Sequence, residues 1–229
     1  MPTTDAPEAF LAQLSPSAAW LRCVAAALHE QLPTGAREAW ATRLYALLAE
    51  ESDDMGTLHA VHVWHSDTIL PLLAGDSTVV GTLSELHREA ARGRMPDQDT
   101  WRSALTPVLL YVYDAAYDRR SAYAEAHTGA RDHALANGFS ATEADAYGHE
   151  YARLSSDSNA RSCAEAQAEA VGRALARAYA TDDGGEAYAD TFPDAQTRAV
   201  VRVLTAQGDE LPAPRLAEGF LSALVVSRS

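Results

Sequence analysis

Three histidines recur at every third position in a short segment of the chain: His59, His62 and His65. Residues three apart are neighbours on a helix, so His59 with His62, or His62 with His65, could chelate one metal ion or carry acid–base chemistry. All three cannot share one helix face, because six residues carry the helix well past its starting face. The alternative is that they are partly buried, hydrogen-bonded histidines of a core helix that also carries Trp64.

A second candidate pair is Asp145 and His149, four residues apart and just after a predicted helix start. This spacing lets a carboxylate and an imidazole meet one metal ion on one helix face, as in helical di-iron proteins. Those proteins need further carboxylate ligands, usually with a Glu-x-x-His motif, and this sequence has no such motif. The alternative is a surface acid–histidine pair that stabilises its helix by ~0.2–0.5 kcal/mol.

A third group consists of Asp114, Tyr117 and Asp118. Paired acids at this spacing are similar to those on the magnesium-binding helices of isoprenoid synthases, and the resemblance implies that Asp114 and Asp118 bind a divalent ion. The alternative is a solvated helix face, because polar residues continue at helical spacing through Ser121 to Asp132. Tyr117 would then be part of the core or of a pocket wall.

The residues that are absent exclude several mechanisms. The chain has 18 arginines and no lysine, which excludes a phosphate-loop lysine, a Schiff-base lysine and a Ser-Lys nucleophile pair. The pairs His29-Glu30 and His149-Glu150 each begin the zinc-protease pattern and lack its second histidine. There is no Cys-x-x-Cys, and the two cysteines, Cys23 and Cys163, do not form a disulfide framework.

Charge and hydropathy narrow the class of protein further. The formal net charge of −14 argues against a nucleic-acid partner, which needs a cationic surface. The N-terminal residues have no cationic start and no apolar core of a signal peptide, and no apolar run approaches the ~20 residues of a membrane span. We therefore expect a cytoplasmic protein without a membrane partner. The use of arginine alone, with abundant alanine, indicates a GC-rich and so bacterial gene.

The elements that must position these residues are helices. Alanine alone makes up 47 of the 229 residues, and with Leu, Arg and Glu, all strong helix formers, it dominates the chain. The sequence predicts one all-α domain over residues 1–229, a bundle of about eight to ten helices, with a close-packed Ala-rich helix over 162–180. An alternative for this region is that Ser155, Asp157, Asn159 and Ser162 face a cavity. A homodimer is compatible with the composition.

Several boundaries follow from local signals. A first helix is predicted over residues 5–14, and the segment 58–73 reads as a helix bent near Pro71, or alternatively as a strand. Asp97 or Asp99 is predicted to cap a helix that Pro107 either kinks or ends, in the second case with a new helix capped by Thr106; from Pro107 the helix is predicted to run to Asn137-Gly138.

Ser140 with Glu143 predicts a capping box at the start of the following helix, and whether that helix breaks at 155–159 stays open. Two further helices are predicted at 194–206 and 214–226.

Two functions fit these observations. The first is a small helical enzyme acting on a small organic molecule in a pocket between helices, with His62, His65, Asp114, Tyr117, Asp118 and His149 as acid–base residues. One divalent metal ion on His62, His65, Asp145 and His149 is the accompanying cofactor hypothesis. The alternative is a non-catalytic helical protein that binds a small molecule or another protein. The enzyme requires His62 or His65 beside one of these acids or His149, around a cavity.

Overall fold

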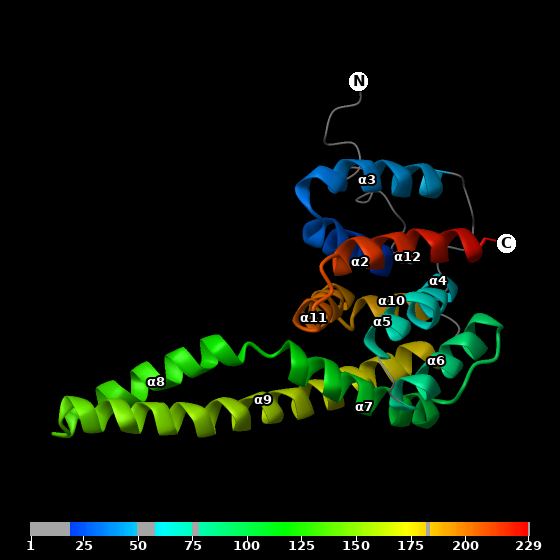
Figure 1. Cartoon of the computed structure of the whole chain (residues 1–229). Helices are drawn as coiled ribbons and strands as arrows, with labels where there is room; N and C mark the ends of the chain where they lie inside the picture. The colour runs from blue at the N-terminus through cyan, green and yellow to red at the C-terminus, as the bar shows by residue number, and fades with distance from the viewer. Residues whose placement is uncertain (1–18, 50–57, 75–77, 182–183, 229) are drawn as a thin grey trace.

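The computed structural model describes residues 19–49, 58–74, 78–181 and 184–228 (Figure 1). Within these ranges every regular element is a helix, so the predicted all-α class is confirmed. In chain order the elements are α2 (Ala19–Gln31), α3 (Thr34–Ala49), α4 (His59–Trp64), η2 (His65–Ile69), α5 (Leu70–Ala74), α6 (Thr78–Ala91), α7 (Gln98–Ala116), α8 (Arg119–Ala136), α9 (Ala141–Tyr179), α10 (Gly184–Ala189), α11 (Pro193–Ala206) and α12 (Pro212–Val226). The helix predicted over 5–14 lies outside the described residues.

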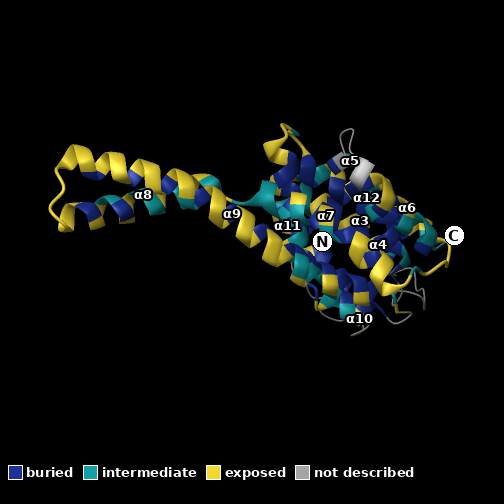
Figure 2. Cartoon of the chain, turned by 90° about the horizontal axis from the view of Figure 1, so that it is seen from below, coloured by how far each residue is buried: buried dark blue, intermediate teal, exposed yellow. Residues whose placement is uncertain are grey.

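The long helix α9 organises the molecule. It has 39 residues, a length of about 58 Å at 1.5 Å per residue. It packs against α8 and against α7, and α8 lies along its first half (Figure 1). α8 and the first half of α9 form an antiparallel pair that projects from the other helices (Figures 1 and 2). We call this pair the hairpin (119–160) and the remaining described residues the body.

A ridge of small side chains explains the close packing of α9. Every fourth residue is buried along almost the whole helix, and each is small: Ala144, Gly148, Ala152, Ser156, Ala160, Ala164, Ala168, Gly172 and Ala176. Rows of residues four apart form the ridges that pack into the grooves of a neighbouring helix. A Cβ atom added at Gly148 would lie 2.9 Å from the backbone oxygen of His127 on α8. The Ala-rich helix predicted over 162–180 is therefore the second half of a longer ridge.

The polar stretch at 155–159 does not interrupt α9. Ser156 occupies one place in the ridge, where it is buried. Asp157, Asn159 and Ser162 are exposed to solvent and Ser155 is half-buried. The interpretation that these polar residues face a cavity is therefore wrong.

The single helix predicted from Pro107 to Asn137 is also wrong, because the chain breaks between α7 and α8. Tyr117 ends α7 in an extended conformation (φ −66°, ψ 129°). The Asp118 carboxylate then caps α8, accepting a hydrogen bond from the Ser121 backbone N–H at 3.0 Å. Arg119 donates to the backbone oxygen of Asp114 at 2.6 Å and to its carboxylate at 2.7 Å. The polar stripe read from the sequence is thus divided between two helices.

The segment 59–74 is helical, as favoured over the strand, but its irregularity precedes Pro71. The Leu70 N–H bonds to the His65 carbonyl, five residues back, which makes η2 a π-helical turn. Proline has no N–H and its ring clashes with the carbonyl four residues earlier, so a regular α-turn before Pro71 would be strained. The π-turn comes directly before this proline. It also places His65 at the point where the helix changes phase.

The capping box predicted at Ser140 and Glu143 is present, and the two helices predicted last in the chain correspond to α11 and α12.

Large aromatic side chains fill the body, with Trp20, Trp64 and Trp101 fully buried. The Trp64 indole N–H donates to the Leu216 carbonyl at 3.0 Å and so ties α4 to α12. Among the described residues, none of the helices combines the length and apolarity that crossing a bilayer requires.

Enlarging a ridge residue should separate the hairpin helices. Ala152 is fully buried between α8 and α9, whereas Ala146 on the same helix is exposed. We expect Ala152→Leu to lower the free energy of unfolding by about 1–3 kcal/mol, because the added carbons have no space. The matched variant Ala146→Leu makes the same chemical change and should stay within about 0.5 kcal/mol of the unmodified protein. Urea unfolding followed by far-UV circular dichroism measures the free energy of unfolding of both variants. Equal losses of stability would contradict the packing role that we assign to the ridge.

Candidate functional site

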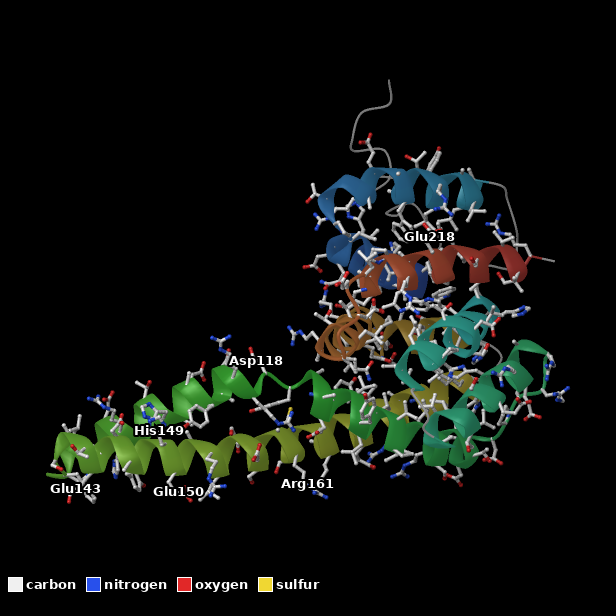
Figure 3. All side chains as sticks on the ribbon, viewed as in Figure 1. Asp118, Glu143, His149, Glu150, Arg161 and Glu218 are labelled. Atoms are coloured by element: carbon white, nitrogen blue, oxygen red, sulfur yellow. The ribbon has the colours of Figure 1, made fainter. Side chains whose placement is uncertain are left out.

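The structure distributes the sequence-predicted site residues over three places. His62 and His65 lie in the body, on α4 and η2. Asp114, Tyr117 and Asp118 lie at the junction of α7 and α8, and Asp118 is labelled at the base of the hairpin in Figure 3. Asp145 and His149 lie on α9 within the hairpin, where His149 is also labelled (Figure 3).

The body holds a cluster of three histidines, His62, His65 and His87, which we call the histidine cluster. His62 and His87 are buried, and their Nδ1 atoms are 2.9 Å apart. One Nδ1 must donate the hydrogen bond and the other accept it, so the two rings are complementary tautomers. Within the described part of the chain, the Nε2 atom of each ring is buried and has no hydrogen-bond partner.

Aromatic rings enclose the histidine cluster. His65 stacks on His87 with ring centroids 4.7 Å apart, and His62 stacks on Trp101 at 5.6 Å. The Tyr179 ring, from the end of α9, lies edge-on to His62 at 5.0 Å. These neighbours are apolar on the surfaces they present, so they desolvate the imidazoles without offering a counter-charge.

This desolvation determines the protonation state of the cluster. Burial, with a smaller contribution from the neighbouring histidines, lowers the pKa of His62 from 6.5 to about 3. Burial also lowers the pKa of His65 to about 4, and that of His87 falls well below its usual value. All three imidazoles are therefore neutral at pH 7, and they act as hydrogen-bonding groups rather than as cations.

A small cavity adjoins the cluster at His65. Its volume is about 50 Å³, well below the ~150 Å³ of an engineered apolar cavity that takes up benzene. Its walls are mainly aliphatic and include Leu83, Leu109 and Val200. The polar side chains that line it are His65, Tyr113, Tyr188, Gln196 and Thr197, and burial raises the pKa of Tyr113 to about 12.

Two of those polar groups are already used within the fold. The Thr197 hydroxyl donates to the Pro193 carbonyl at 2.8 Å, and the Gln196 amide donates to the Thr191 carbonyl at 2.8 Å. His65 and the two tyrosines are the remaining polar residues of the cavity wall. The residues lining the cavity include no aspartate, glutamate or arginine.

The predicted magnesium pair at the α7–α8 junction has other partners. The Asp114 carboxylate pairs with Arg119, and the Asp118 carboxylate caps α8. Because the helix breaks between them, Asp114 and Asp118 do not present two carboxylates on one helical face. Tyr117 is half-buried at the end of α7.

In the hairpin, Asp145 and His149 are joined by a residue that the sequence did not indicate. His127 on α8 lies beside both, and these three residues are the one group in the described ranges whose side chains could together hold a metal ion. The sequence also missed His87, Trp101 and Tyr179. His87 does fall on the apolar stripe of its helix with Leu83 and Ala90, which is the only signal for its burial.

Comparisons of this chain with known protein families, with curated proteins and with solved structures give no match.

The buried histidines should make stability fall as the solution is acidified. An unfolded chain protonates its histidines near pH 6.5, whereas His62 and His65 stay neutral in the folded protein down to about pH 3–4. Between pH 6.5 and 4 the unfolded state thus binds more protons, so the free energy of unfolding decreases as pH falls. The slope should reach about 1.4 kcal/mol per pH unit for each buried histidine.

Urea unfolding at pH 7.5, 6.5, 5.5 and 4.5 measures this slope. The double variant His62→Phe/His87→Phe removes both partners of the buried hydrogen bond and should reduce the slope, leaving the contribution of His65. His133→Ala alters an exposed histidine on α8 and should leave the slope unchanged. A double variant with the slope of the unmodified protein would show that the cluster is not the origin of the acid sensitivity.

Proposed function

We propose that the protein is a binding protein, and that its body takes the apolar end of a small uncharged organic molecule into the cavity beside His65. The observation that carries this proposal is the composition of the cavity wall. Aliphatic side chains from several helices converge there with one imidazole and two tyrosines. An apolar pocket with a few convergent polar groups is the usual form of a small-molecule site.

The ligand is expected to be uncharged because no charged side chain lines the cavity. Burying an ionised group without a partner is strongly unfavourable. His65 is neutral at pH 7, so it offers a hydrogen bond rather than an ion pair. The volume of about 50 Å³ admits only the end of a molecule. Half-buried Tyr113 and Gln196 would then border the polar remainder.

The residues that line the cavity favour a binding function over a catalytic one. The enzyme hypothesis requires His62 or His65 to share a cavity with Asp114, Asp118, Asp145 or His149. None of these four residues lines this cavity, and each has contacts elsewhere in the fold. With its pKa lowered to about 4, His65 is a weak general base at pH 7, and no carboxylate lines the cavity beside it.

Cytoplasmic location, a bacterial source and a homodimeric state remain predictions from the sequence, and the proposed function does not depend on them.

Two variants should change binding in opposite directions. Phenol is a suitable neutral probe, and ¹H–¹⁵N correlation spectra can follow the indole N–H of Trp64, a residue of the cavity wall. We expect saturable shifts with phenol, and benzoate binding at least ~10-fold more weakly because its carboxylate would be desolvated. Val200→Phe fills the cavity and should abolish binding. Leu109→Ala enlarges the cavity and should strengthen binding.

Leu44→Ala is the matched control for Leu109→Ala. Leu44 is equally a buried leucine, but it belongs to α3 and does not line the cavity. Both substitutions should cost about 2–5 kcal/mol of stability, yet only Leu109→Ala should alter phenol binding. The proposed function is wrong if Val200→Phe binds phenol as the unmodified protein does, or if benzoate binds equally well.

A further inference from the structure

The hairpin holds a second group of chemically capable side chains, remote in the fold from the cavity. The Nε2 atom of His127 on α8 lies 3.3 Å from one carboxylate oxygen of Asp145 on α9. The Nε2 atom of His149 lies 3.6 Å from the other oxygen of the same carboxylate. The ligand atoms of the three residues all lie within 4.8 Å of one another.

These separations are those of ligands around a small cation. Bond lengths of about 2.0–2.2 Å at a tetrahedral zinc ion place neighbouring ligand atoms about 3.3–3.6 Å apart. Two imidazoles and one carboxylate form the mixed nitrogen and oxygen set that zinc and similar transition metals prefer, whereas magnesium and calcium prefer oxygen ligands alone. Three protein ligands leave the fourth position to water.

The remaining ring nitrogen of His149 is held in a way that suits a ligand. The Tyr123 hydroxyl lies 2.7 Å from His149 Nδ1. When Nδ1–H donates to this oxygen, the lone pair of Nε2 is directed toward Asp145. Metal-binding histidines are commonly oriented by such a hydrogen bond on the other ring nitrogen. Figure 3 shows His149 on the side of α9 toward α8.

His127 has a nitrogen that the protein leaves unsatisfied. Its Nε2 atom is buried and makes no hydrogen bond within the described residues, although the Asp145 carboxylate is near. A cation between the two groups would satisfy both. The ridge allows this approach, since a Cβ atom added at Gly148 would lie 3.0 Å from the His127 ring.

One positive side chain is close enough to compete. Arg131 Nε lies 3.8 Å from the Asp145 carboxylate, and its Nη1 lies 3.6 Å from Asp132. Both contacts are long and partly exposed, so they contribute little. The formal net charge of −14 favours cation uptake overall.

We propose that His127, Asp145 and His149 bind one zinc-class transition-metal ion that links α8 to α9, with Tyr123 as a positioning residue. The site lies in the hairpin and stands independently of the proposed ligand in the body. The sequence spacing predicted Asp145 and His149 as metal ligands. The packing of α8 on α9 adds His127 to them, whereas His62 and His65 lie in the body.

Zinc titration of the full, untagged chain after treatment with a chelator tests the site by isothermal titration calorimetry. We expect one Zn²⁺ per chain and no binding of Mg²⁺ at millimolar concentration. His127→Ala and His149→Ala should each weaken zinc affinity at least ~100-fold. His133→Ala is the matched control, because it removes an exposed histidine from the same helix as His127. It should bind zinc as the unmodified protein does.

Tyr123→Phe tests the positioning role. It keeps the ring and should weaken zinc affinity about 10–100-fold, while the Tm of the metal-free protein stays unchanged. Zinc should raise the Tm of the unmodified protein and of His133→Ala, but not that of His149→Ala. The proposal is overturned if the unmodified chain binds no zinc at 100 µM total metal, or if His133→Ala loses affinity as His127→Ala does. Circular dichroism of each metal-free variant excludes loss of folding as the cause.

Discussion

The close approach of helices along the small-residue ridge of α9 is the constraint on which the other features depend. A helix of 39 residues would ordinarily need large apolar side chains to hold its neighbours. Here alanine, glycine and serine at every fourth position bring the backbones together instead. Each contact is small, but dispersion accumulates over the length of the ridge. Because the ridge continues without interruption, one rigid element carries both Tyr179 in the body and His149 in the hairpin.

The body is assembled around the last turns of that helix. Tyr179 contacts the rings of His62 and Trp101, so α4 and α7 meet at the end of α9. The π-turn before Pro71 adds a second constraint, since it fixes where His65 points relative to Leu70. The cavity lies beside this turn, since His65, Ile69 and Leu70 all line it.

Much of the fold could be predicted from the sequence, because helix formation is largely a local matter. The capping box at Ser140 and the helical reading of 59–74 are both determined by neighbouring residues. The break at Tyr117 was missed because Asp118 serves equally well on a helix face and as an N-cap. The sites were predicted only in part. Spacing shows that Asp145 and His149 share a face, but which histidine faces them from α8 depends on tertiary packing, which spacing does not contain.

The two groups of histidines show how surroundings decide what an imidazole can do. In the body, His62 and His87 are desolvated, and no carboxylate lines the adjoining cavity. A metal cation there would meet neutral imidazole nitrogens, with no carboxylate of the cavity wall to balance its charge. In the hairpin, Asp145 supplies the negative charge and its side chain remains 52% exposed, so a cation keeps part of its hydration. Histidine therefore lines an apolar cavity in the body, whereas in the hairpin it belongs to the proposed cation site.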